Sequence, residues 1–276
     1  MTTLDGKVAF ITGAARGQGR SHAVRLASEG ADIVAIDICR DIETMNYPNA
    51  TPADLDETAR LVGEQGRRVL TLQVDVRDAA AVSTAVDTAW DEFGRLDIVL
   101  ANAGIVVLGD TSADPAQVWQ DILSTNLSGA WYAVSAAIPK IIQGGRGGVI
   151  ILTGSTAGVR PTPGIAASGA AYTASKFGLV GLGKQLASAL AEHSIRVNVI
   201  HPTGVASGMT MNSAMQKLME EAAAGGANTI SAMQNAMPID ILQPEDISDT
   251  VSFLVSDKAK WITGVSLPVD AGFSVR

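Results

Sequence analysis

The stretch Val8–Gly19, VAFITGAARGQG, joins an apolar run that favours β structure to a turn containing three glycines. A helical pattern begins near Gln18, so the stretch predicts a strand, a glycine-rich turn and a helix. Glycines at 13, 17 and 19 permit a tight turn and let backbone N–H groups approach a pyrophosphate at the helix N-terminus. A glycine pattern alone is weak evidence, so the interpretation depends on the residues that follow.

The second apolar run, Asp32–Asp37, ends in a carboxylate 24 residues after Gly13. At this position Asp37 is suited to accept hydrogen bonds from both hydroxyls of an adenosine ribose and to repel a 2′-phosphate, which favours NAD over NADP. Arg16 in the glycine turn leaves an alternative open, because its guanidinium could receive that phosphate.

Strands and helices alternate along the rest of the chain. This alternation predicts one α/β domain over residues 1–276, doubly wound, with parallel strands and helices on both faces. Further strands are expected at 68–76, 96–101, 148–153, 195–200 and 265–269, with an amphipathic helix at 79–93. Ligands of such sheets bind at the carboxyl ends of the strands, where Asp75, Asn102 and Ser155 are found.

Tyr172 and Lys176 are four residues apart and therefore lie on one face of any helix that contains them. A free tyrosine titrates near ~10, and a nearby cation stabilises the phenolate and lowers its pKa toward the working range. The pair therefore predicts an acid/base group. Tyr and Lys also occur at this spacing in helices without chemistry, so the glycine turn is needed to support the prediction.

Two further polar residues point to the same cavity. Asn126 is expected in the first half of a long helix after Pro115, where asparagine is mildly unfavourable and a side-chain task is indicated. Solvent exposure is the alternative for Asn126. Ser155 follows the fifth predicted strand, and a 16-residue loop separates it from Tyr172, so both side chains can face one cavity.

Two segments are candidates for covers. Residues 203–242 carry six of the eight methionines and no strand signal, which fits either a packing helix or a mobile, apolar substrate lid. The connection between Asp37 and the third strand has about ten residues more than a helix and two ordinary loops require. This excess maps to Arg40–Thr51, which is either a surface loop or a cover over the nucleotide that slows its release.

Composition excludes several classes of function. A net charge of −8 and a pI of about 4.8 disfavour nucleic acid and anionic membranes as partners. A single cysteine, Cys39, and an N-terminus that runs directly into a strand favour a cytoplasmic protein. His22, His193 and His201 do not have metal-ligand spacing, so no metal site is expected and surface or packing roles are favoured.

The ordered set of motifs resembles the short-chain dehydrogenase/reductase family across essentially the whole chain. It consists of Thr12-Gly13-x-x-x-Gly17-x-Gly19, Asn102-Ala103-Gly104, Asn126, Ser155 and Tyr172-x-x-x-Lys176. Within the family, residues 13–22, Asp37-Ile38-Cys39 and the Tyr47-Pro48 insertion resemble the mycofactocin-associated, carveol dehydrogenase-like members. The sequence departs from the usual pattern at Ala101, where the family has asparagine, and at Thr203, which separates the usual Pro-Gly pair.

The resemblance implies a Rossmann fold with a seven-stranded parallel sheet and a catalytic tetrad of Asn126, Ser155, Tyr172 and Lys176. It also implies a homotetramer. Gly178, Gly181 and Gly183 would permit close approach of helices from different subunits, or they serve packing inside one subunit. The expected NAD-binding residues are Gly13, Arg16, Gly17, Gln18, Gly19, Asp37, Ile38, Cys39, Asp75, Val76, Asn102, Ala103, Gly104, Tyr172, Lys176, Pro202, Thr203 and Val205.

The activity implied is hydride transfer between a small hydrophobic alcohol, or its ketone, and NAD. Tyr172 would move the proton, Ser155 would hold the substrate oxygen, Lys176 would lower the Tyr172 pKa, and Asn126 would anchor a water relay. NAD held in place would be recycled by mycofactocin as electron carrier. The alternatives are a non-catalytic nucleotide sensor or scaffold, which would have no use for a tetrad, and a sugar-nucleotide epimerase, whose glycine spacing and longer C-terminal region are not found here.

Overall fold

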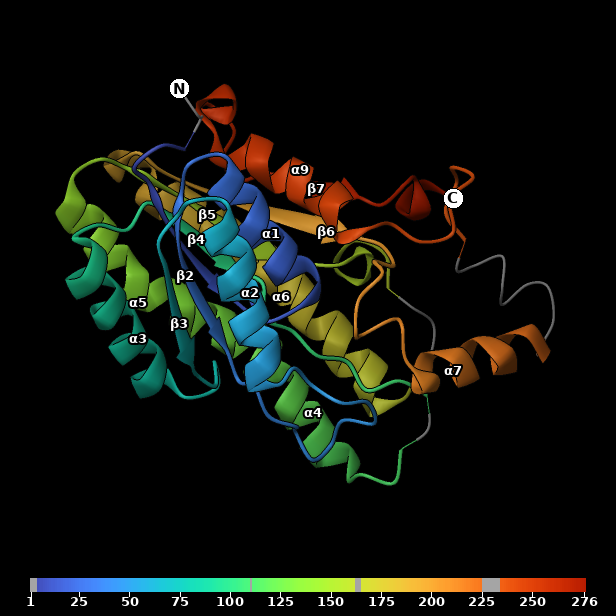
Figure 1. The fold of residues 1–276 in the computed structure, drawn as a ribbon. Helices are drawn as coiled ribbons and strands as arrows, with labels where there is room; N and C mark the ends of the chain where they lie inside the picture. Colours follow the sequence, from blue (N-terminus) through green and yellow to red (C-terminus); the bar gives the residue numbers. More distant parts are fainter. Residues whose placement is uncertain (1–3, 110, 162–164, 225–233) are drawn as a thin grey trace.

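The protein is described by a computed structural model that covers residues 4–109, 111–161, 165–224 and 234–276. Seven parallel strands form one sheet in the order β3-β2-β1-β4-β5-β6-β7, which confirms the predicted α/β fold (Figure 1). Sequential strands are added on both sides of β1, so the winding reverses between β1 and β4. The strands are β1 Val8–Thr12, β2 Asp32–Asp37, β3 Val69–Gln73, β4 Ile98–Ala101, β5 Gly148–Thr153, β6 Ile195–Pro202 and β7 Ser266–Val269.

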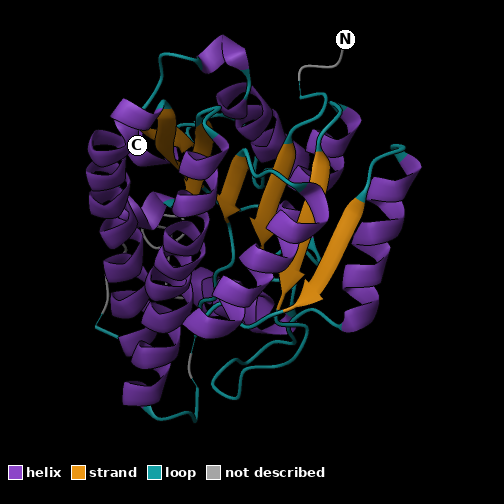
Figure 2. Cartoon of the chain, turned by 90° about the vertical axis from the view of Figure 1, so that its left-hand side faces the viewer, coloured by secondary structure: helices purple, strands orange, loops and turns teal. Residues whose placement is uncertain are grey.

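Helices cover both faces of the sheet (Figure 2). Buried residues of α1, α2 and α9 form one hydrophobic cluster with the sheet, and those of α3, α5 and α6 form another. The helices are α1 Gly17–Ser28, α2 Pro52–Glu64, α3 Ala79–Phe93, α4 Pro115–Leu123, α5 Gly129–Gly144, α6 Ala167–Leu190, α7 Ser213–Ala224 and α9 Pro244–Val255. Short helical turns are η1 Ser124–Ser128, η2 Thr156–Gly158, η3 Ala191–His193, η4 Asp257–Ala259 and η5 Phe273–Val275.

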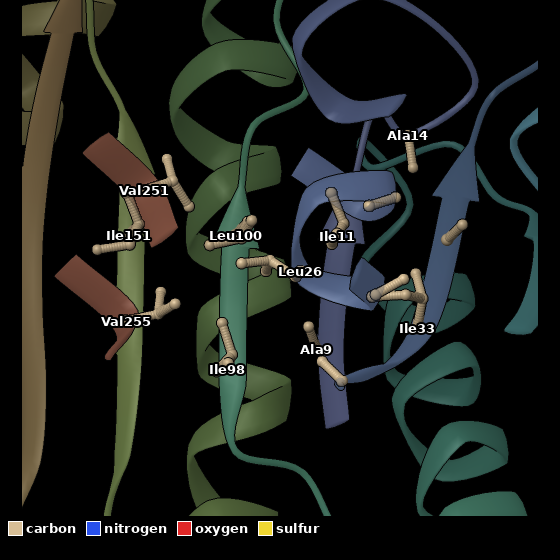
Figure 3. Close-up of a cluster of buried hydrophobic side chains, with 14 of the residues drawn as sticks. Ala9, Ile11, Ala14, Leu26, Ile33, Ile98, Leu100, Ile151, Val251 and Val255 are labelled. Carbon is tan, nitrogen blue, oxygen red and sulfur yellow. The ribbon is translucent and has the colours of Figure 1, made fainter. Parts of the chain in front are cut away.

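The central strands are buried on both faces because successive side chains alternate between the two helical layers. In β1, Ala9 and Ile11 pack with Leu26 of α1 and Val251 of α9 (Figure 3), whereas Phe10 joins the cluster on the opposite face. All of these side chains are at most 1% exposed. Full burial of such a leucine, isoleucine or phenylalanine contributes roughly 1.5–3 kcal/mol, so the two layers hold β1 rigidly beneath the glycine turn.

The starts of α1 and α2 differ in how they are capped. Thr51 and Asp54 form a reciprocal capping box at α2, and Pro52 occupies the first turn. At α1 the residue before the helix is Arg16, whose side chain makes no capping bond within the described structure. The N-terminal amides of α1 therefore remain available for a ligand at the edge of the sheet.

The expected long helix after Pro115 is not regular. A π-helical turn, η1, lies between α4 and α5, and Asn126 lies in this turn instead of in an α-helix. A π turn widens the backbone locally and is frequent at functional sites. The unfavourable residue noticed in the sequence therefore coincides with a departure from α-helical geometry.

Two of the three glycines expected at a subunit interface serve a different purpose. A Cβ at Gly178 would lie 2.9 Å from Leu127, and one at Gly183 would lie 2.5 Å from Val199 of β6. The interface prediction is wrong for these two residues, because they let α6 pack closely inside its own subunit. Around Gly181 no described atom lies within 4 Å of the Cβ position, so only this glycine faces outward.

The predicted lid region, 203–242, contains α7, which lies at the periphery of the ribbon in Figure 1. Met211 and Met219 are exposed. Met233 falls in 225–233, outside the described residues. Over the part of the chain that the structure describes, no helix is long and apolar enough to cross a membrane.

Candidate active site

The glycine turn brings the backbone of β1 against the end of β4. Gly13 has φ +67°, and a Cβ on it would lie 2.8 Å from the Cα of Ala103. A Cβ on Gly19 would lie 2.0 Å from the carbonyl oxygen of Gly13. Both positions therefore require glycine, one for its conformation and both for space.

Hydrogen bonds lock this contact. The Thr12 hydroxyl oxygen accepts from the backbone N–H groups of Asn102 and Ala103, both at 3.0 Å. The Asn102 side-chain amide donates to the carbonyl oxygens of Thr12 (3.0 Å) and Gly13 (3.3 Å). Asn102 thus orients the turn through its side chain, and its role is structural as well as pocket-forming.

Asp37 lies at the end of β2 with its carboxylate oriented by the glycine turn. One oxygen accepts from the Ala15 N–H at 3.1 Å, and the other accepts from the Cys39 N–H at 3.2 Å. Burial raises the pKa of Asp37, and the two backbone bonds together with the Arg16 charge act in the opposite direction. The carboxylate is therefore fixed by the backbone while it still faces the pocket.

One pocket collects most of the nucleotide-binding residues predicted from the sequence. The predicted residues in its wall are Gly13, Arg16, Gly17, Gln18, Gly19, Asp37, Ile38, Asp75, Val76, Asn102, Ala103 and Gly104. Six expected residues are not among the described wall residues: Cys39, Tyr172, Lys176, Pro202, Thr203 and Val205. Cys39 is buried behind Asp37 with φ +47°, and burial raises its pKa to about 12, so its thiol is not a reactive group.

The remaining wall comes from segments with no recognisable binding motif. These residues are Ile42, Tyr47, Asn49, Ala50, Val74, Ile105, Thr125, Ser207, Gly208 and Met209. The four from Arg40–Thr51 confirm that this segment folds over the pocket, and it is called the cover segment below. Its excess length was the sequence signal. Ser207, Gly208 and Met209 belong to the 203–242 region, which its methionines marked as a possible substrate lid, and the structure places these three residues in the wall of the nucleotide pocket.

Polar contacts fix the cover segment. The Thr44 hydroxyl donates to Asp121 of α4 at 2.8 Å, and the Asn46 side-chain amide donates to the Leu108 carbonyl oxygen. The Arg16 guanidinium donates to the Pro48 carbonyl oxygen at 2.6 Å. Arg16 thus joins the glycine turn to the cover segment, and this contact uses part of the guanidinium that was considered for a 2′-phosphate.

Three buried polar atoms in the pocket wall have no hydrogen-bond partner among the described residues. They are Gln18 Oε1, Tyr47 OH and Thr125 Oγ1. Buried polar groups in native structures are nearly always hydrogen-bonded, so three such atoms around one cavity indicate a polar ligand that completes their bonding.

Tyr172 is half-buried in α6, with the Ser155 side chain close to its phenol. The Lys176 ammonium lies 5.4 Å from the centre of the Tyr172 ring and donates to the Thr153 carbonyl oxygen at 2.8 Å. Burial raises the pKa of Tyr172, with the Ser155 side chain opposing it, and burial lowers the pKa of Lys176 to about 8. The expected lowering of the Tyr172 pKa by Lys176 is therefore not found in this state, because desolvation dominates.

Asn126 stands between the nucleotide pocket and the catalytic helix. Its amide donates to the Ile105 carbonyl oxygen at 2.9 Å, and its oxygen accepts from the Ile105 N–H at 2.8 Å. A Cβ on Gly104 would lie 3.4 Å from Asn126 Oδ1 and 3.5 Å from Lys176 Nζ. The small residues after β4 thus let Asn126 and Lys176 come close to the pocket wall.

His201 is a positioning residue that the sequence did not reveal. It is fully buried at the end of β6, with Nδ1 2.7 Å from the Ser155 carbonyl oxygen and Nε2 2.6 Å from the Ser266 hydroxyl oxygen. Burial lowers its pKa, so the neutral ring carries its proton on Nδ1, donates to Ser155 and accepts from Ser266. The expected packing role is correct, and it fixes the backbone that carries the Ser155 hydroxyl.

Over the described residues, the structure has no group of three histidine, cysteine, aspartate or glutamate side chains that could hold a metal ion.

Comparison with known proteins gives, for the whole chain, the family that its sequence motifs indicate. The family model for short chain dehydrogenases matches residues 7–218. The (-)-trans-carveol dehydrogenase of Rhodococcus erythropolis is 42% identical, with 100% of both chains covered. The crystal structure of carveol dehydrogenase from Mycobacterium avium in complex with NAD superposes with a TM-score of 0.92 at 46% identity, covering 100% of both chains.

A short chain dehydrogenase from Mycobacterium paratuberculosis, crystallised bound to NAD, has a TM-score of 0.90 and is 42% identical, covering 99% of this chain and 100% of its own. The fold, the ordered motifs and the family model agree over the glycine turn, strands β1 to β6 and the helix that carries Tyr172 and Lys176. The chain belongs to the short-chain dehydrogenase family.

Proposed function

We propose that this protein transfers a hydride between a hydrophobic secondary alcohol, or its ketone, and NAD, with Tyr172 as the proton carrier. The observation that carries the proposal is the Tyr172 phenol, close to the Ser155 side chain and with its ring centre 5.4 Å from the ammonium of the buried Lys176. As a member of its family, the chain is an NAD-dependent oxidoreductase that acts on CH–OH groups. The residue roles and the substrate class are the parts proposed.

The pocket fits NAD on grounds independent of the family. Glycines bring backbone amides to the N-terminus of α1, which suits a pyrophosphate. The Asp37 carboxylate suits a ribose diol, and the unpaired atoms of Gln18, Tyr47 and Thr125 require polar partners that the described residues do not supply. We propose the residues in this wall as the nucleotide-binding set.

NAD, when bound, supplies a carbon that accepts the hydride as the alcohol is oxidised. Ser155 holds the substrate oxygen through its hydroxyl, and Tyr172 removes the hydroxyl proton. The raised pKa of Tyr172 keeps the phenol protonated, so it can donate that proton when a ketone is reduced. In the oxidising direction the phenol first loses this proton to solvent and then, as phenolate, takes the proton of the alcohol. Protonated Lys176 stabilises the phenolate during transfer, and Asn126 anchors a water path that returns the proton to solvent.

The substrate is proposed to be a hydrophobic cyclic alcohol of terpenoid or steroid type. Met209 lines the wall of the pocket, and Met211 and Met219 are exposed apolar side chains of the 203–242 region. Methionine adapts to irregular apolar shapes, so we propose that this region closes over the substrate as a lid within one catalytic domain. The carveol dehydrogenase relative, at 42% identity, supports this class.

The cover segment supports tight retention of the cofactor in a cytoplasmic enzyme. It is anchored to α4, to the chain after β4 and to the glycine turn, so NAD leaves only when these contacts open. We propose that NAD remains bound between turnovers and that its electrons pass to mycofactocin. The resemblance of the Tyr47-Pro48 insertion to mycofactocin-associated relatives supports this step.

A homotetramer is proposed from the outward side chains of α4, α5 and α6. Trp119, Trp131 and Phe177 are each about two-fifths exposed on these helices, and Gly181 faces outward in α6. A second apolar set lies near β7 and includes Phe253, Trp261 and Val265. Two separate apolar surfaces suit an assembly with two kinds of interface.

No observation favours the nucleotide sensor or the epimerase.

We expect Tyr172→Phe to lower turnover by roughly 10²–10⁴-fold, because it removes the proton carrier and little volume. NAD affinity should change little, since the wall around the glycine turn remains. Turnover of a panel of hydrophobic alcohols, followed by cofactor absorbance, tests this, with Tyr132→Phe on α5 as control. A variant that keeps more than about a tenth of the wild-type rate contradicts the role of Tyr172.

Asp37 should determine the choice of cofactor. Asp37→Ala removes the negative charge that repels a 2′-phosphate, and it also removes two hydrogen-bond acceptors for the ribose. NAD should therefore bind about tenfold more weakly and NADP more tightly. Asp37→Asn keeps the volume and isolates the effect of charge. Titration of both nucleotides is the measurement, with the melting temperature recorded because Asp37 also holds the Ala15 N–H. Wild-type protein that already prefers NADP would assign the phosphate to Arg16.

Cofactor retention predicts that freshly purified protein contains close to one NAD per subunit. Heat denaturation followed by nucleotide quantification measures this content. Turnover should be slow with added NAD as the only acceptor and faster with an artificial electron acceptor. Nucleotide-free protein that turns over rapidly on added NAD would show ordinary cofactor exchange instead.

Light scattering should give the mass of a tetramer at micromolar concentration. Trp131→Glu should reduce the mass, because a charge would be buried in the interface, whereas Met219→Glu on α7 should leave it unchanged. A monomeric wild-type protein would exclude the assembly.

A further inference from the structure

Tyr47 lies in the cover segment, and the described residues do not satisfy the hydrogen-bonding capacity of its phenol hydroxyl. The side chain is only 7% exposed and lines the nucleotide pocket. Its hydroxyl has no hydrogen-bond partner within the described residues. A buried donor in this condition costs free energy, and the structure offers no compensating contact in the protein.

The contacts around Tyr47 place its hydroxyl on the catalytic side of the pocket. The backbone N–H of Val106 lies near the phenol oxygen and can only donate to it, so the hydroxyl proton still lacks an acceptor. Tyr172 and Arg16 are both close enough to influence the Tyr47 pKa. Val106 follows Gly104, the residue whose surroundings include Asn126 and Lys176. The phenol therefore lies between the glycine turn and α6, the helix that carries Tyr172 and Lys176.

The apolar part of the cover segment shares a cluster with the catalytic tyrosine. Ile42 and Met45 pack with Ile105, Ile122 and Tyr172. This cluster holds the segment against the active site from the apolar side, and the bonds of Thr44, Asn46 and Pro48 hold it from the polar side. Tyr47 is thus presented by a backbone that is fixed before any ligand binds, which lowers the entropy cost of its contact.

The position of the hydroxyl identifies the chemistry of its partner. A dinucleotide that reaches from the glycine turn to Tyr172 presents phosphate and ribose oxygens in this interval, and the nearby Arg16 guanidinium also favours an anionic oxygen. Phosphate and ribose oxygens accept a phenol proton well. An apolar substrate surface would leave the donor without a partner.

We propose that the Tyr47 hydroxyl donates a hydrogen bond to a pyrophosphate or ribose oxygen of the bound dinucleotide and is a retaining contact of the cover segment. This inference rests on the proposed function, since it requires NAD in the pocket. It assigns a specific binding role to the cover segment in addition to steric closure. Removal of the hydroxyl should weaken cofactor binding without lowering the stability of the nucleotide-free protein.

The test is Tyr47→Phe, which deletes one oxygen and keeps the ring. Tyr132→Phe removes a phenol oxygen from α5, outside the nucleotide pocket, and is the matched control. Three quantities are measured for each protein after removal of bound nucleotide: the NAD dissociation constant, the NAD release rate in a chase experiment, and the melting temperature without and with NAD.

We expect Tyr47→Phe to raise the NAD dissociation constant about tenfold, mainly through faster release. Its nucleotide-free melting temperature should equal or exceed that of wild type, because an unsatisfied buried donor is lost. The rise in melting temperature on adding NAD should be smaller than in wild type. Tyr132→Phe should bind and release NAD as wild type does.

Each contrary outcome has a definite meaning. Wild-type protein that does not bind NAD would overturn the proposed function itself. Wild-type binding with unchanged affinity and release in Tyr47→Phe would overturn only the role of Tyr47, as would an effect confined to the Michaelis constant of the alcohol. An unfolded or strongly destabilised nucleotide-free variant would also overturn it, because the hydroxyl would then have a structural partner.

Discussion

The close approach of the β1 turn to the end of β4 is the constraint on which the site depends. Gly13 and Ala103 come so near that a side chain on Gly13 would enter backbone space, and Thr12 and Asn102 close the contact with four hydrogen bonds. The winding of the sheet reverses between these two strands. Displacement of either strand would therefore open the pocket floor and move Gly104 away from Asn126 and Lys176.

Burial dominates the electrostatics of the catalytic group. It favours the neutral form of both Tyr172 and Lys176, which explains why the phenol pKa is raised although a lysine lies beside it. In such surroundings a transient charge on one group is strongly stabilised by an opposite charge on the other, because little water screens them. With a pKa of about 8, Lys176 keeps its proton at neutral pH, so a neutral phenol beside an ammonium becomes a phenolate–ammonium pair during proton transfer.

The sequence was sufficient for those parts of the structure that local patterns determine. Apolar runs located the seven strands, and the spacing of Gly13 and Asp37 located the pocket. The four-residue spacing of Tyr172 and Lys176 brought together the pair on which the proposed proton transfer rests. It was insufficient wherever a contact joins distant segments. The π turn at Asn126, the inward packing of Gly178 and Gly183, the bond from His201 to Ser155 and the wall formed by Ser207–Met209 all depend on which elements become neighbours. Periodicity along one segment contains no information on such neighbours.

Through Asp121, the position of the cover segment depends on residues far from it in the chain. Its carboxylate accepts from Thr44 of the cover segment, from Gln117 in its own helix and from Arg77, which in turn binds Asp75 in the pocket wall. The cover segment therefore cannot be treated as an exchangeable loop. Grafting residues 40–51 onto a relative that lacks Asp121 and Arg77 would transfer the Tyr47 phenol without the anchors that orient it. The length of the loop alone is therefore a poor guide to which relatives share this arrangement.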